Sequence, residues 1–344
     1  MFNRRPLLLS IVLLATMIVA ACGQAGTGPR PAATGAASAD VGTTNVASTV
    51  VEPDDGAKPI VDFLGQAKTS IDVGVYLLSD KTVIDALKDA KKRGLKVRVM
   101  MEEHPFGGGG NNATVFKQLQ EAGIDVKWSN PTFRFTHEKI IVVDRKLAAI
   151  MTLNLTRSAL TKNREFAIVD ADPAEVAEVQ AIFDADWERK SIKPSDPDLV
   201  VSPDNARAQF LQIIGRAQRT LDVYAEEMQD REVQSALRSA AQRGVKVRAI
   251  MSPAEAREKD TNKPGRDNII QGGVSVRLLK KPYIHAKVFL VDGTIAFVGS
   301  QNISATSLNL NREMGMIVAS PPTIERIQRA FDKDWAAGTE AAGR

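Results

Sequence analysis

HEKIIVVD at residues 137–144 and HAKVFLVD at residues 285–292 share the pattern His-x-Lys-x4-Asp. The chain contains three histidines, and this duplicated pattern uses two of them. Residues downstream repeat in the same register, 148 positions apart (285 − 137, 302 − 154, 313 − 165 and 335 − 187): Asn154 and Asn302, Glu165 and Glu313, Trp187 and Trp335. The duplication predicts one site that is assembled from two half-sites.

Helices and apolar strands alternate around the first copy. The pattern predicts helices over residues 58–68, 81–93, 113–122 and 174–187, and strands over 71–77, 96–101, 124–128, 139–144, 147–153 and 165–170. Gly94 and Gly123 follow two of these helices, where glycine commonly ends a helix. Alternating helices and strands with short turns predict an α/β fold, with a mixed, mostly parallel sheet flanked by helices.

The second half repeats this order of elements. Leu221-Asp222-Val223 matches Ile71-Asp72-Val73 at an offset of 150 (221 − 71), so the second copy lacks two residues between Gly273 and His285. A linker rich in Pro and Asp, at residues 191–203, joins the halves. We therefore expect two fused repeats, at residues 53–192 and 193–344, related by a pseudo-two-fold axis with the site between them.

The N-terminal segment carries a different signal. Arg4 and Arg5 precede an apolar run over residues 7–21, which is too short for a comfortable membrane span. The run ends in Val19-Ala20-Ala21-Cys22, which resembles the lipobox of bacterial lipoproteins; a plain secretory signal or an uncleaved anchor is the alternative. We expect a signal peptide at residues 1–21, lipidation of Cys22 and a flexible tether at 22–52. The protein would then be exported and lipid-anchored at the bacterial cell envelope.

The composition is that of a globular protein. Hydrophobic residues make up 44% of the chain and charged residues 25%, which excludes wholesale disorder. The formal net charge of +4 falls to about +2 without Arg4 and Arg5, which is too weak to argue for a polyanionic partner. Cys22 is the only cysteine, so an intrachain disulfide is excluded, and the few scattered His and Cys residues predict no metal site and no cofactor.

The duplicated residues suit chemistry at phosphorus. A histidine acts as a nucleophile or a general acid near neutral pH, and a lysine two residues later on a strand points to the same face. A fixed cation beside an imidazole suits an anionic reacting group, most simply a phosphate. Displacement at phosphorus needs attacking and leaving atoms on opposite sides, so one imidazole would attack while the other, protonated, gives its proton to the departing oxygen.

The two motifs, followed by Asn154 in one half and by Gly299-Ser300-x-Asn302 in the other, resemble the phospholipase D superfamily. The resemblance covers Pro53 to Trp335. It implies that the two motifs form one active site, which works through a covalent phosphohistidine without a metal.

Position by position, the resemblance implies the following roles. His137 is the nucleophile and His285 the general acid, while Lys139 and Lys287 hold the phosphate oxygens. Asn154 and Asn302, with Thr152 and Ser300, line the phosphate pocket. Glu165 and Glu313 orient the histidines, and Asp144 and Asp292 complete the motifs and look structural.

One departure separates the halves. The second copy has Gly299-Ser300 where the first has Met151-Thr152. A methionine puts a side chain where glycine would allow a close backbone approach, so we expect Met151 to narrow one side of the pocket or tilt its loop.

Other candidate residues have simpler interpretations. His104 has no counterpart in the second half and is expected at the surface, before a loop at residues 107–110 near the substrate mouth. That glycine run lacks the Gly-Lys-Ser/Thr of a phosphate-binding loop. The three tryptophans are expected to pack in or against the core: Trp128, Trp187 and Trp335.

The substrate is expected to be a phosphodiester. Anchoring at Cys22 makes phospholipid the nearest substrate, and four aromatic residues near the motifs would meet acyl chains, head groups or nucleic-acid bases: Phe106, Phe133, Phe135 and Tyr283. We expect a phospholipase D-type hydrolase, monomeric because both half-sites lie in one chain. The alternatives are a secreted nuclease, a cardiolipin-synthase-like transferase and a surface lipoprotein that only binds.

Overall fold

The computed structural model describes residues 45–108, 111–254 and 259–342. The expected signal peptide, Cys22 and most of the expected tether lie outside the described residues. Within the described part of the chain, no helix is both long enough and apolar enough to span a bilayer.

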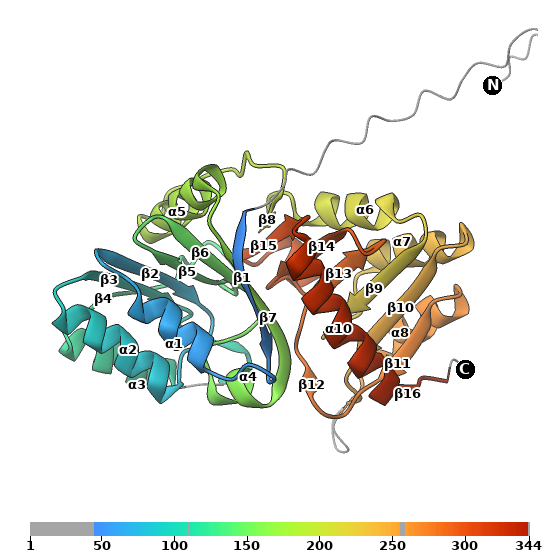
Figure 1. The fold of residues 1–344 in the computed structure, drawn as a ribbon, viewed down its shortest axis with the longest axis horizontal. Helices are drawn as coiled ribbons and strands as arrows, with labels where there is room; N and C mark the ends of the chain where they lie inside the picture. The colour runs from blue at the N-terminus through green and yellow to red at the C-terminus, as the bar shows by residue number, and fades with distance from the viewer. Residues whose placement is uncertain (1–44, 109–110, 255–258, 343–344) are drawn as a thin grey trace, which may run out of the picture. The chain divides into compact units, whose positions relative to one another are not determined.

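The first repeat forms a mixed sheet in the order β1-β7-β6-β5-β2-β3-β4 (Figure 1). Strands β2, β3 and β4 pair in parallel, and the other pairs of this order are antiparallel. The strands are β1 (Val46–Glu52), β2 (Ser70–Val75), β3 (Lys96–Met101), β4 (Asp125–Trp128), β5 (Lys139–Val143), β6 (Leu147–Met151) and β7 (Asn163–Asp170). The helices are α1 (Lys58–Gly65), α2 (Lys81–Lys92), α3 (Asn112–Glu121), α4 (Arg157–Thr161) and α5 (Pro173–Trp187), with a 3-10 turn, η1, at Phe106–Gly108.

The second repeat has the same sheet order, β8-β15-β14-β13-β9-β10-β11, with β16 added beside β11. Its strands are β8 (Leu199–Ser202), β9 (Thr220–Tyr224), β10 (Lys246–Met251), β11 (Ser275–Leu278), β12 (Tyr283–Ile284), β13 (Val288–Val291), β14 (Ile295–Gly299), β15 (Glu313–Val318) and β16 (Thr339–Glu340). Its helices are α6 (Ala206–Arg216), α7 (Arg231–Gln242), α8 (Lys263–Gln271), α9 (Ala305–Asn309) and α10 (Pro321–Ala337). The predicted α/β class, with two fused repeats and a mixed sheet in each, is confirmed. The expectation that the sheets are mostly parallel is wrong, because within the two strand orders only β2-β3-β4 and β9-β10-β11 pair in parallel, while β5-β6-β7 and β13-β14-β15 pair antiparallel.

Matching local signals set corresponding helices in the two repeats. Asp80 caps α2 by accepting hydrogen bonds from two backbone N–H groups, and Asp230 caps α7 in the same way. Each helix is followed two residues later by a glycine at positive φ, Gly94 (90°) and Gly244 (93°), a conformation that favours glycine. Local sequence therefore determines where these helices begin and end.

The first strand of each repeat was missed by the sequence interpretation. Residues 46–52, expected in the tether, form β1 along β7, and residues 199–202, expected in the linker, form β8 along β15. The expected boundary of the folded body at residue 53 is therefore wrong. Each strand lies at an edge of its order, and its one partner in that order is a strand more than 100 residues later in the sequence.

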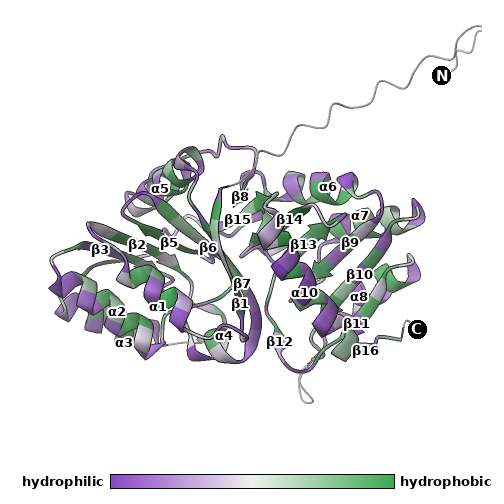
Figure 2. Ribbon diagram, viewed as in Figure 1, coloured by the Kyte–Doolittle hydropathy of each residue, from purple (hydrophilic) through white to green (hydrophobic). Residues whose placement is uncertain are grey.

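Buried residues form three apolar clusters, and one of them is shared by the two repeats. The shared cluster joins β5, β6, β7 and α5 of the first repeat to β13, β14, β15 and α10 of the second. Figure 2 shows hydrophobic residues concentrated along the strands, with hydrophilic residues on the outer faces of the helices. Because the strands that carry the motifs help to build this shared core, burial of apolar surface places the two half-sites next to each other.

Candidate active site

A pocket of about 460 Å³ contains both motif histidines. It lies where the ends of β2 and β9 meet the segments that precede β5 and β13. Its lining comes from both repeats: Tyr76, Leu77, Phe106, Arg134, Phe135, His137, Asn154, Glu226, Glu227, Gln229, His285, Asn302, Ser304, Thr306, Ser307 and Asn311. The predicted residues His137, His285, Asn154 and Asn302 are thus brought together.

Each histidine is oriented by a glutamate of the other repeat. His137 Nδ1 lies 2.8 Å from Glu313 Oε2, and His285 Nδ1 lies 2.8 Å from Glu165 Oε1. Because a carboxylate accepts, Nδ1 carries the proton in both rings, and the lone pair of a neutral ring is then on Nε2. The crossed pairs produce two rings with the same chemically useful nitrogen.

Backbone pairing between the repeats places these rings. The N–H of His137 donates to the carbonyl of Arg312 (2.8 Å), and the N–H of His285 donates to the carbonyl of Arg164 (3.3 Å). Strand β12, just before His285, pairs in parallel with the start of β7. Each histidine therefore pairs through its backbone with the arginine that directly precedes its orienting glutamate. Arg312 precedes Glu313, and Arg164 precedes Glu165.

The orienting glutamates are fully buried and have their own hydrogen-bond donors. Thr152 Oγ1 donates to Glu165 Oε2 (2.7 Å), while Ser307 Oγ and Asn311 Nδ2 donate to Glu313 Oε1 (2.6 and 2.9 Å). Thr152 was expected to line the phosphate pocket, and the structure instead places it behind Glu165.

Ser300 was also expected in the pocket lining. Its side chain is buried, where Oγ accepts from the N–H of Met314 (3.2 Å) and donates to the carbonyl of the same residue (3.3 Å). It therefore stabilises the loop after β14 from behind and does not face the pocket.

The two lysines occupy equivalent places but have different partners. Lys139 Nζ donates to the carbonyl of His137 (2.7 Å), and Lys287 Nζ donates to that of His285 (2.5 Å). Lys287 Nζ also lies 2.6 Å from Glu226 Oε2. The ion pairs among the described residues include no such carboxylate for Lys139, which stands 5.4 Å from the centre of the Tyr76 ring.

Burial changes the protonation of the first half-site. It lowers the pKa of His137 to about 4, because the opposing charge of Glu313 does not offset it and Lys139 adds to it. Burial also lowers the pKa of Lys139 to about 7. The charge of Glu313 opposes this shift, and the charge of Lys287 adds to it. A neutral, unprotonated Nε2 at His137 is therefore the stable form at neutral pH.

Sequence reasoning missed Tyr76 and Glu226. They occupy the same position in the two repeats, 150 residues apart (226 − 76), at the ends of β2 and β9. The Tyr76 ring meets His137 edge-on, with ring centroids 4.5 Å apart, whereas Glu226 Oε2 lies 3.5 Å from His285 Nε2. The sequence could have revealed them through the alignment of Ile71-Asp72-Val73 with Leu221-Asp222-Val223. Tyr76 and Glu226 each lie three residues after the aligned stretch.

The motif aspartates lie outside the pocket. The Asp144 carboxylate accepts from the backbone N–H groups of residues 68, 69 and 70, and that of Asp292 from those of residues 218, 219 and 220. Burial raises the pKa of Asp144, but these hydrogen bonds outweigh it and lower the pKa to about 2. Asp144 and Asp292 therefore hold the turns before β2 and β9, in keeping with the structural role expected of them.

Met151 does not narrow the pocket, so that expectation is wrong. Its side chain is buried in the first-repeat core. A Cβ at Gly299 would lie 2.5 Å from both Gln301 Oε1 and Gly315 Cα, and 2.7 Å from the Phe297 ring. The residue equivalent to Phe297 in the first repeat is Ala149. The first repeat therefore has a small residue at 149 and a large one at 151, whereas the second repeat has a large residue at 297 and glycine at 299.

Aromatic residues surround the mouth of the pocket. Phe106 is 80% exposed, and its N–H donates to the Tyr76 hydroxyl (2.6 Å). Phe106, one of the four aromatic residues expected near the motifs, lines the pocket directly before the loop at residues 107–110. Residues 109 and 110 of that loop lie outside the described residues. His104 is at the surface as expected, with 84% of its side chain exposed. The tryptophans pack in or against the core as expected: Trp128 stacks on half-buried Phe116, and Trp187 and Trp335 stack on buried Phe183 and Phe331.

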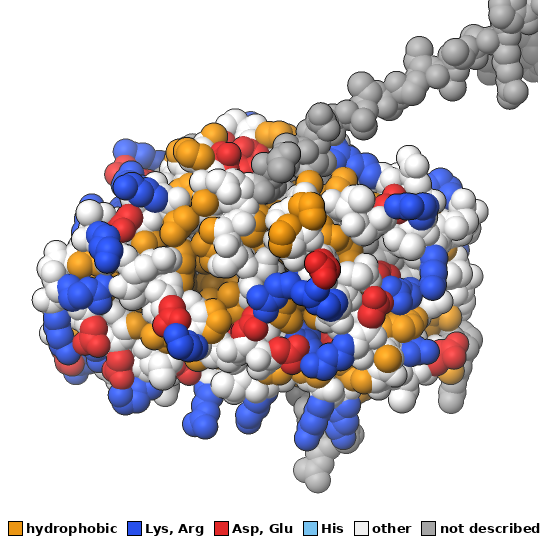
Figure 3. All heavy atoms as spheres, viewed as in Figure 1, with side chains coloured by type: hydrophobic (Ala, Val, Ile, Leu, Met, Phe, Trp, Pro, Cys, Tyr) orange, Lys and Arg blue, Asp and Glu red, His pale blue; other side chains and the backbone are white. Residues whose placement is uncertain are grey.

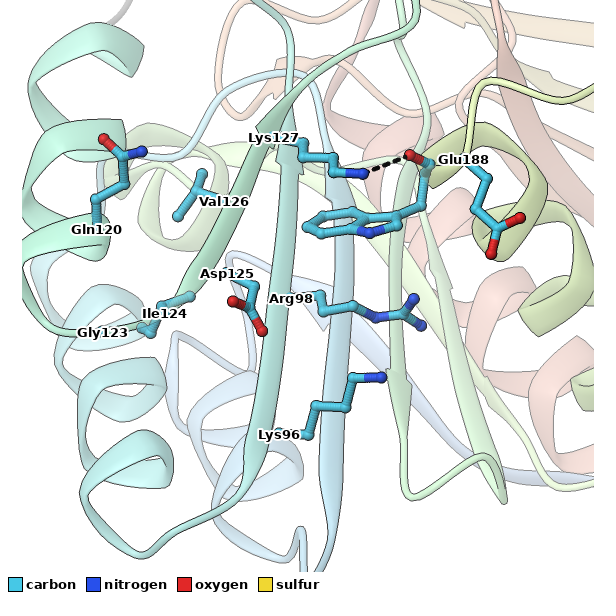
Figure 4. A pocket seen from close by; sticks show the side chains of 10 residues that line it. Lys96, Arg98, Gln120, Gly123, Ile124, Asp125, Val126, Lys127 and Glu188 are labelled. Atoms are coloured by element: carbon cyan, nitrogen blue, oxygen red, sulfur yellow. Dashed lines mark hydrogen bonds between the residues drawn. The ribbon is translucent and has the colours of Figure 1, made fainter.

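A larger cavity, about 830 Å³, lies over β3 and β4 (Figure 4). Its arginine, Arg98, is neutralised by Asp72 and Asp184, and Lys127 Nζ donates to the carbonyl of Trp187 (3.1 Å). Arg98 and Lys127, two of the cations that line this cavity, are therefore already engaged by protein groups. Among the described residues, three carboxylates approach within 4.8 Å of one another and could hold a metal, Glu175, Asp196 and Asp198, but none of them lines the histidine pocket.

Comparisons with known proteins agree with this geometry. The family described as "Cardiolipin synthase, PLD-like domain" matches residues 60–187 and 210–335, once in each repeat. Cardiolipin synthase 1 of Bacillus cereus is 25% identical over 359 residues, covering 89% of this chain and 69% of that protein. A mitochondrial cardiolipin hydrolase of Chlamydomonas reinhardtii is 29% identical over 128 residues, covering 37% of this chain and 56% of that protein.

A solved structure has the same fold over most of the chain. Polyphosphate kinase from Porphyromonas gingivalis superposes with a TM-score of 0.69 at 16% identity, covering 86% of this chain and 48% of that one. At this identity the likeness concerns the fold alone.

Proposed function

This chain belongs to the phospholipase D superfamily, with one PLD-like domain in each half, and we propose that it cleaves phospholipid phosphodiesters through a covalent phosphohistidine. The observation that carries the proposal is the crossed pairing of His137 with Glu313 and of His285 with Glu165 at one pocket. Two oriented imidazoles and two lysines at one place supply an attacking atom, a proton donor and charge for the phosphate.

The proposed reaction has two steps. In the first, Nε2 of one histidine attacks phosphorus, and the other histidine gives a proton to the leaving oxygen as the P–O bond breaks. In the second, water attacks phosphorus, loses a proton to the second histidine and releases the first. Lys139 and Lys287 hold the phosphate oxygens, and Asn154 and Asn302 donate to them from the pocket wall. These groups account for each proton and charge, so the proposed mechanism needs no metal.

A lipid substrate is supported by the surroundings of the pocket. Exposed Phe106 and half-buried Phe135 provide apolar surface at its mouth. Exposed lysines and arginines lie on α4 (Arg157), directly after it (Lys162) and before β12 (Lys280 and Lys281). Figure 3 shows Lys and Arg side chains standing out along the lower edge, where Figure 1 shows these elements. Apolar groups beside cations suit an anionic phospholipid surface.

The test is turnover of phosphatidylglycerol vesicles with chelator present. Turnover is measured as release of glycerol and formation of phosphatidic acid. The native protein is expected to react, and His137→Asn and His285→Asn are expected to abolish the reaction. His104→Asn, a change at the third histidine, is the matched control and should react like the native protein. Turnover that survives in either motif variant, or that the chelator removes, would contradict the mechanism.

Phosphatidyl transfer is a second candidate. It is favoured by the family description and by the Bacillus cereus relative, which is a cardiolipin synthase. The same phosphohistidine would then be attacked by the hydroxyl of a second phosphatidylglycerol. The vesicle assay separates the two outcomes, since transfer yields cardiolipin and glycerol without phosphatidic acid. A nuclease would instead cleave DNA, and a binding lipoprotein would bind vesicles without turnover.

We also propose that Cys22 carries a lipid anchor and that the chain works as a monomer at the cell envelope. The lipobox-like Val19-Ala20-Ala21-Cys22 supports the anchor, and the two half-sites in one chain support the monomer. Detergent phase partitioning of the native protein and of Cys22→Ser tests the anchor, because only the native protein should enter the detergent phase. Size measurement in detergent tests the monomer.

A further inference from the structure

The two halves of the active site are electrically unequal. At equivalent positions beyond β2 and β9 stand Tyr76 in the first half and Glu226 in the second. Both line the pocket, so the difference lies at the reacting groups themselves. The shared motif residues do not predict this asymmetry, because they are the same in both halves.

Glu226 contacts both reactive groups of its half-site. Its Oε2 lies 2.6 Å from Lys287 Nζ and 3.5 Å from His285 Nε2. On the other side of the ring, His285 Nδ1 lies 2.8 Å from Glu165 Oε1. Both nitrogens of His285 therefore face carboxylates, and a ring that carried a proton on each nitrogen would have an acceptor for each.

His137 has different surroundings. Its Nδ1 pairs with Glu313, and the edge of its ring meets the Tyr76 ring. Among the ion pairs of the described residues, none joins His137 Nε2 to a carboxylate. This ring is stable when Nε2 is unprotonated, which is the form that can attack phosphorus.

We propose that Glu226 is a positioning residue that keeps His285 protonated, and so makes His285 the proton donor and leaves His137 as the nucleophile. The inference rests on the proposed phosphohistidine chemistry. His137 Nε2 would form the P–N bond with its lone pair, while the P–O electron pair leaves with the departing oxygen. That oxygen takes the proton from His285 Nε2, which later receives one from the attacking water or alcohol.

The charged groups around His285 agree with this assignment. The glutamates near it come from different elements: Glu165 on β7, and Glu226 and Glu227 beyond β9. The cations are Lys287 on its own segment and Lys139 across the pocket, where His137 and Glu313 also lie. Burial raises the pKa of Glu226, but His285 and Lys287 outweigh it and lower the pKa to about 2, so the carboxylate is ionised throughout the working range.

Glu226 also stands where a phosphate oxygen would be held. An oxygen bound by both Lys287 Nζ and His285 Nε2 would occupy the place of Glu226 Oε2. A phosphate must therefore share or displace this carboxylate contact, which weakens anion binding while it secures the proton. Removing the charge of Glu226 should therefore strengthen anion binding and weaken retention of the proton on His285.

The test compares Glu226→Gln with the native protein on bis(p-nitrophenyl) phosphate and on phosphatidylglycerol vesicles. The amide keeps the shape and removes the charge. We expect the basic limb of the kcat profile to move about one unit lower in pH, so that kcat at alkaline pH falls roughly tenfold. We also expect KM and the inhibition constant of inorganic phosphate to fall. Glu232→Gln, at an exposed site outside the pocket, should leave both unchanged.

Two further readouts distinguish failure of the inference from failure of the proposed function. Imidazole NMR on the three histidines, with His104→Asn to aid assignment, should show that His285 stays protonated to higher pH in the native protein than in Glu226→Gln. This measurement needs no turnover. Turnover quenched in alkaline denaturant, where the P–N bond survives, should leave the phosphoryl label on His137, and a label on His285 or an unmoved NMR titration would overturn the inference. Turnover without any phosphohistidine would overturn the proposed mechanism instead.

Discussion

Arg164 of the first repeat binds Asp334 of the second through two hydrogen bonds, from Nε to Oδ2 (2.6 Å) and from Nη2 to Oδ1 (3.0 Å). Arg312 of the second repeat pairs with Asp186 of the first through one hydrogen bond, from Nη2 to Oδ1 (3.1 Å), with Nε 2.9 Å from Oδ2. All four residues are buried. Each arginine directly precedes the glutamate that orients a histidine, so these crossed pairs hold the active-site strands in register.

Replacing Arg164 by methionine should destabilise the whole protein. The change leaves the buried Asp334 with Tyr224 as its remaining hydrogen-bond donor, and breaking a buried ion pair costs about 3–5 kcal/mol. The free energy of unfolding, measured with urea, checks this. The matched control is Arg326→Met, whose side chain is 38% exposed and pairs with Asp55; there we expect about 1 kcal/mol or less. Equal losses would contradict the proposed bracing role.

The crossed orientation of the histidines predicts crossed effects. Glu313→Gln should impair the histidine of the other repeat, and kcat should fall by about a hundredfold or more, because misorientation removes general acid–base or nucleophilic function. Ser307→Ala removes a donor to Glu313 and should cost less. Rapid-quench measurement of phosphohistidine formation tests the assignment: Glu313→Gln should slow formation of the label on His137. A label that forms at the native rate would refute the role of this pair.

The pKa values of the first half-site predict how activity depends on pH. Burial lowers the pKa of His137 to about 4, so attack should persist down to that pH and fall below it, where Nε2 is protonated. Burial lowers the pKa of Lys139 to about 7, so its charge is present below pH 7 and lost above it. The KM for the phosphodiester should therefore rise as the pH passes 7. In Lys139→Arg, which keeps its charge, KM should stay flat across that range, and a rise equal to the native one would contradict the assignment.

Stability should depend on pH through Glu138. Burial, with the Asp186 carboxylate adding to it, raises the pKa of Glu138 to about 8. The folded protein then keeps a proton that the unfolded chain releases above about pH 4.5, so this contribution to stability falls as the pH rises from there through 8. Glu138→Gln should remove that part of the decline, up to roughly 1.4 kcal/mol per pH unit. Urea midpoints at pH 5.5 and 8.5, with exposed Glu103→Gln as the control, measure it; equal declines in the two variants would count against this explanation.

Much of the fold followed from short-range patterns. Helix ends at Gly94 and Gly123, the apolar strands and the 148-residue repeat are properties of neighbouring residues or of two aligned stretches, and these predictions are confirmed. Strands β1 and β8 could not be predicted in the same way, because residues 46–52 and 199–202 become strands only by pairing with β7 and β15. The expectation that Met151 narrows the pocket failed for a similar reason. Met151 packs beside a small residue, Ala149, where the second repeat has Gly299 beside the large Phe297, and this difference is visible only once both cores are packed.

The sequence by itself determined which residue types meet at the site, because the duplicated His, Lys, Asn and Glu positions need only alignment of one half with the other. Only the tertiary structure decided how they pair. His137 depends on Glu313 and His285 on Glu165 because the backbone ladders cross between repeats. It also brought Glu226 against His285 while Tyr76 covers His137, since the ends of β2 and β9 reach the pocket only when both sheets share a core.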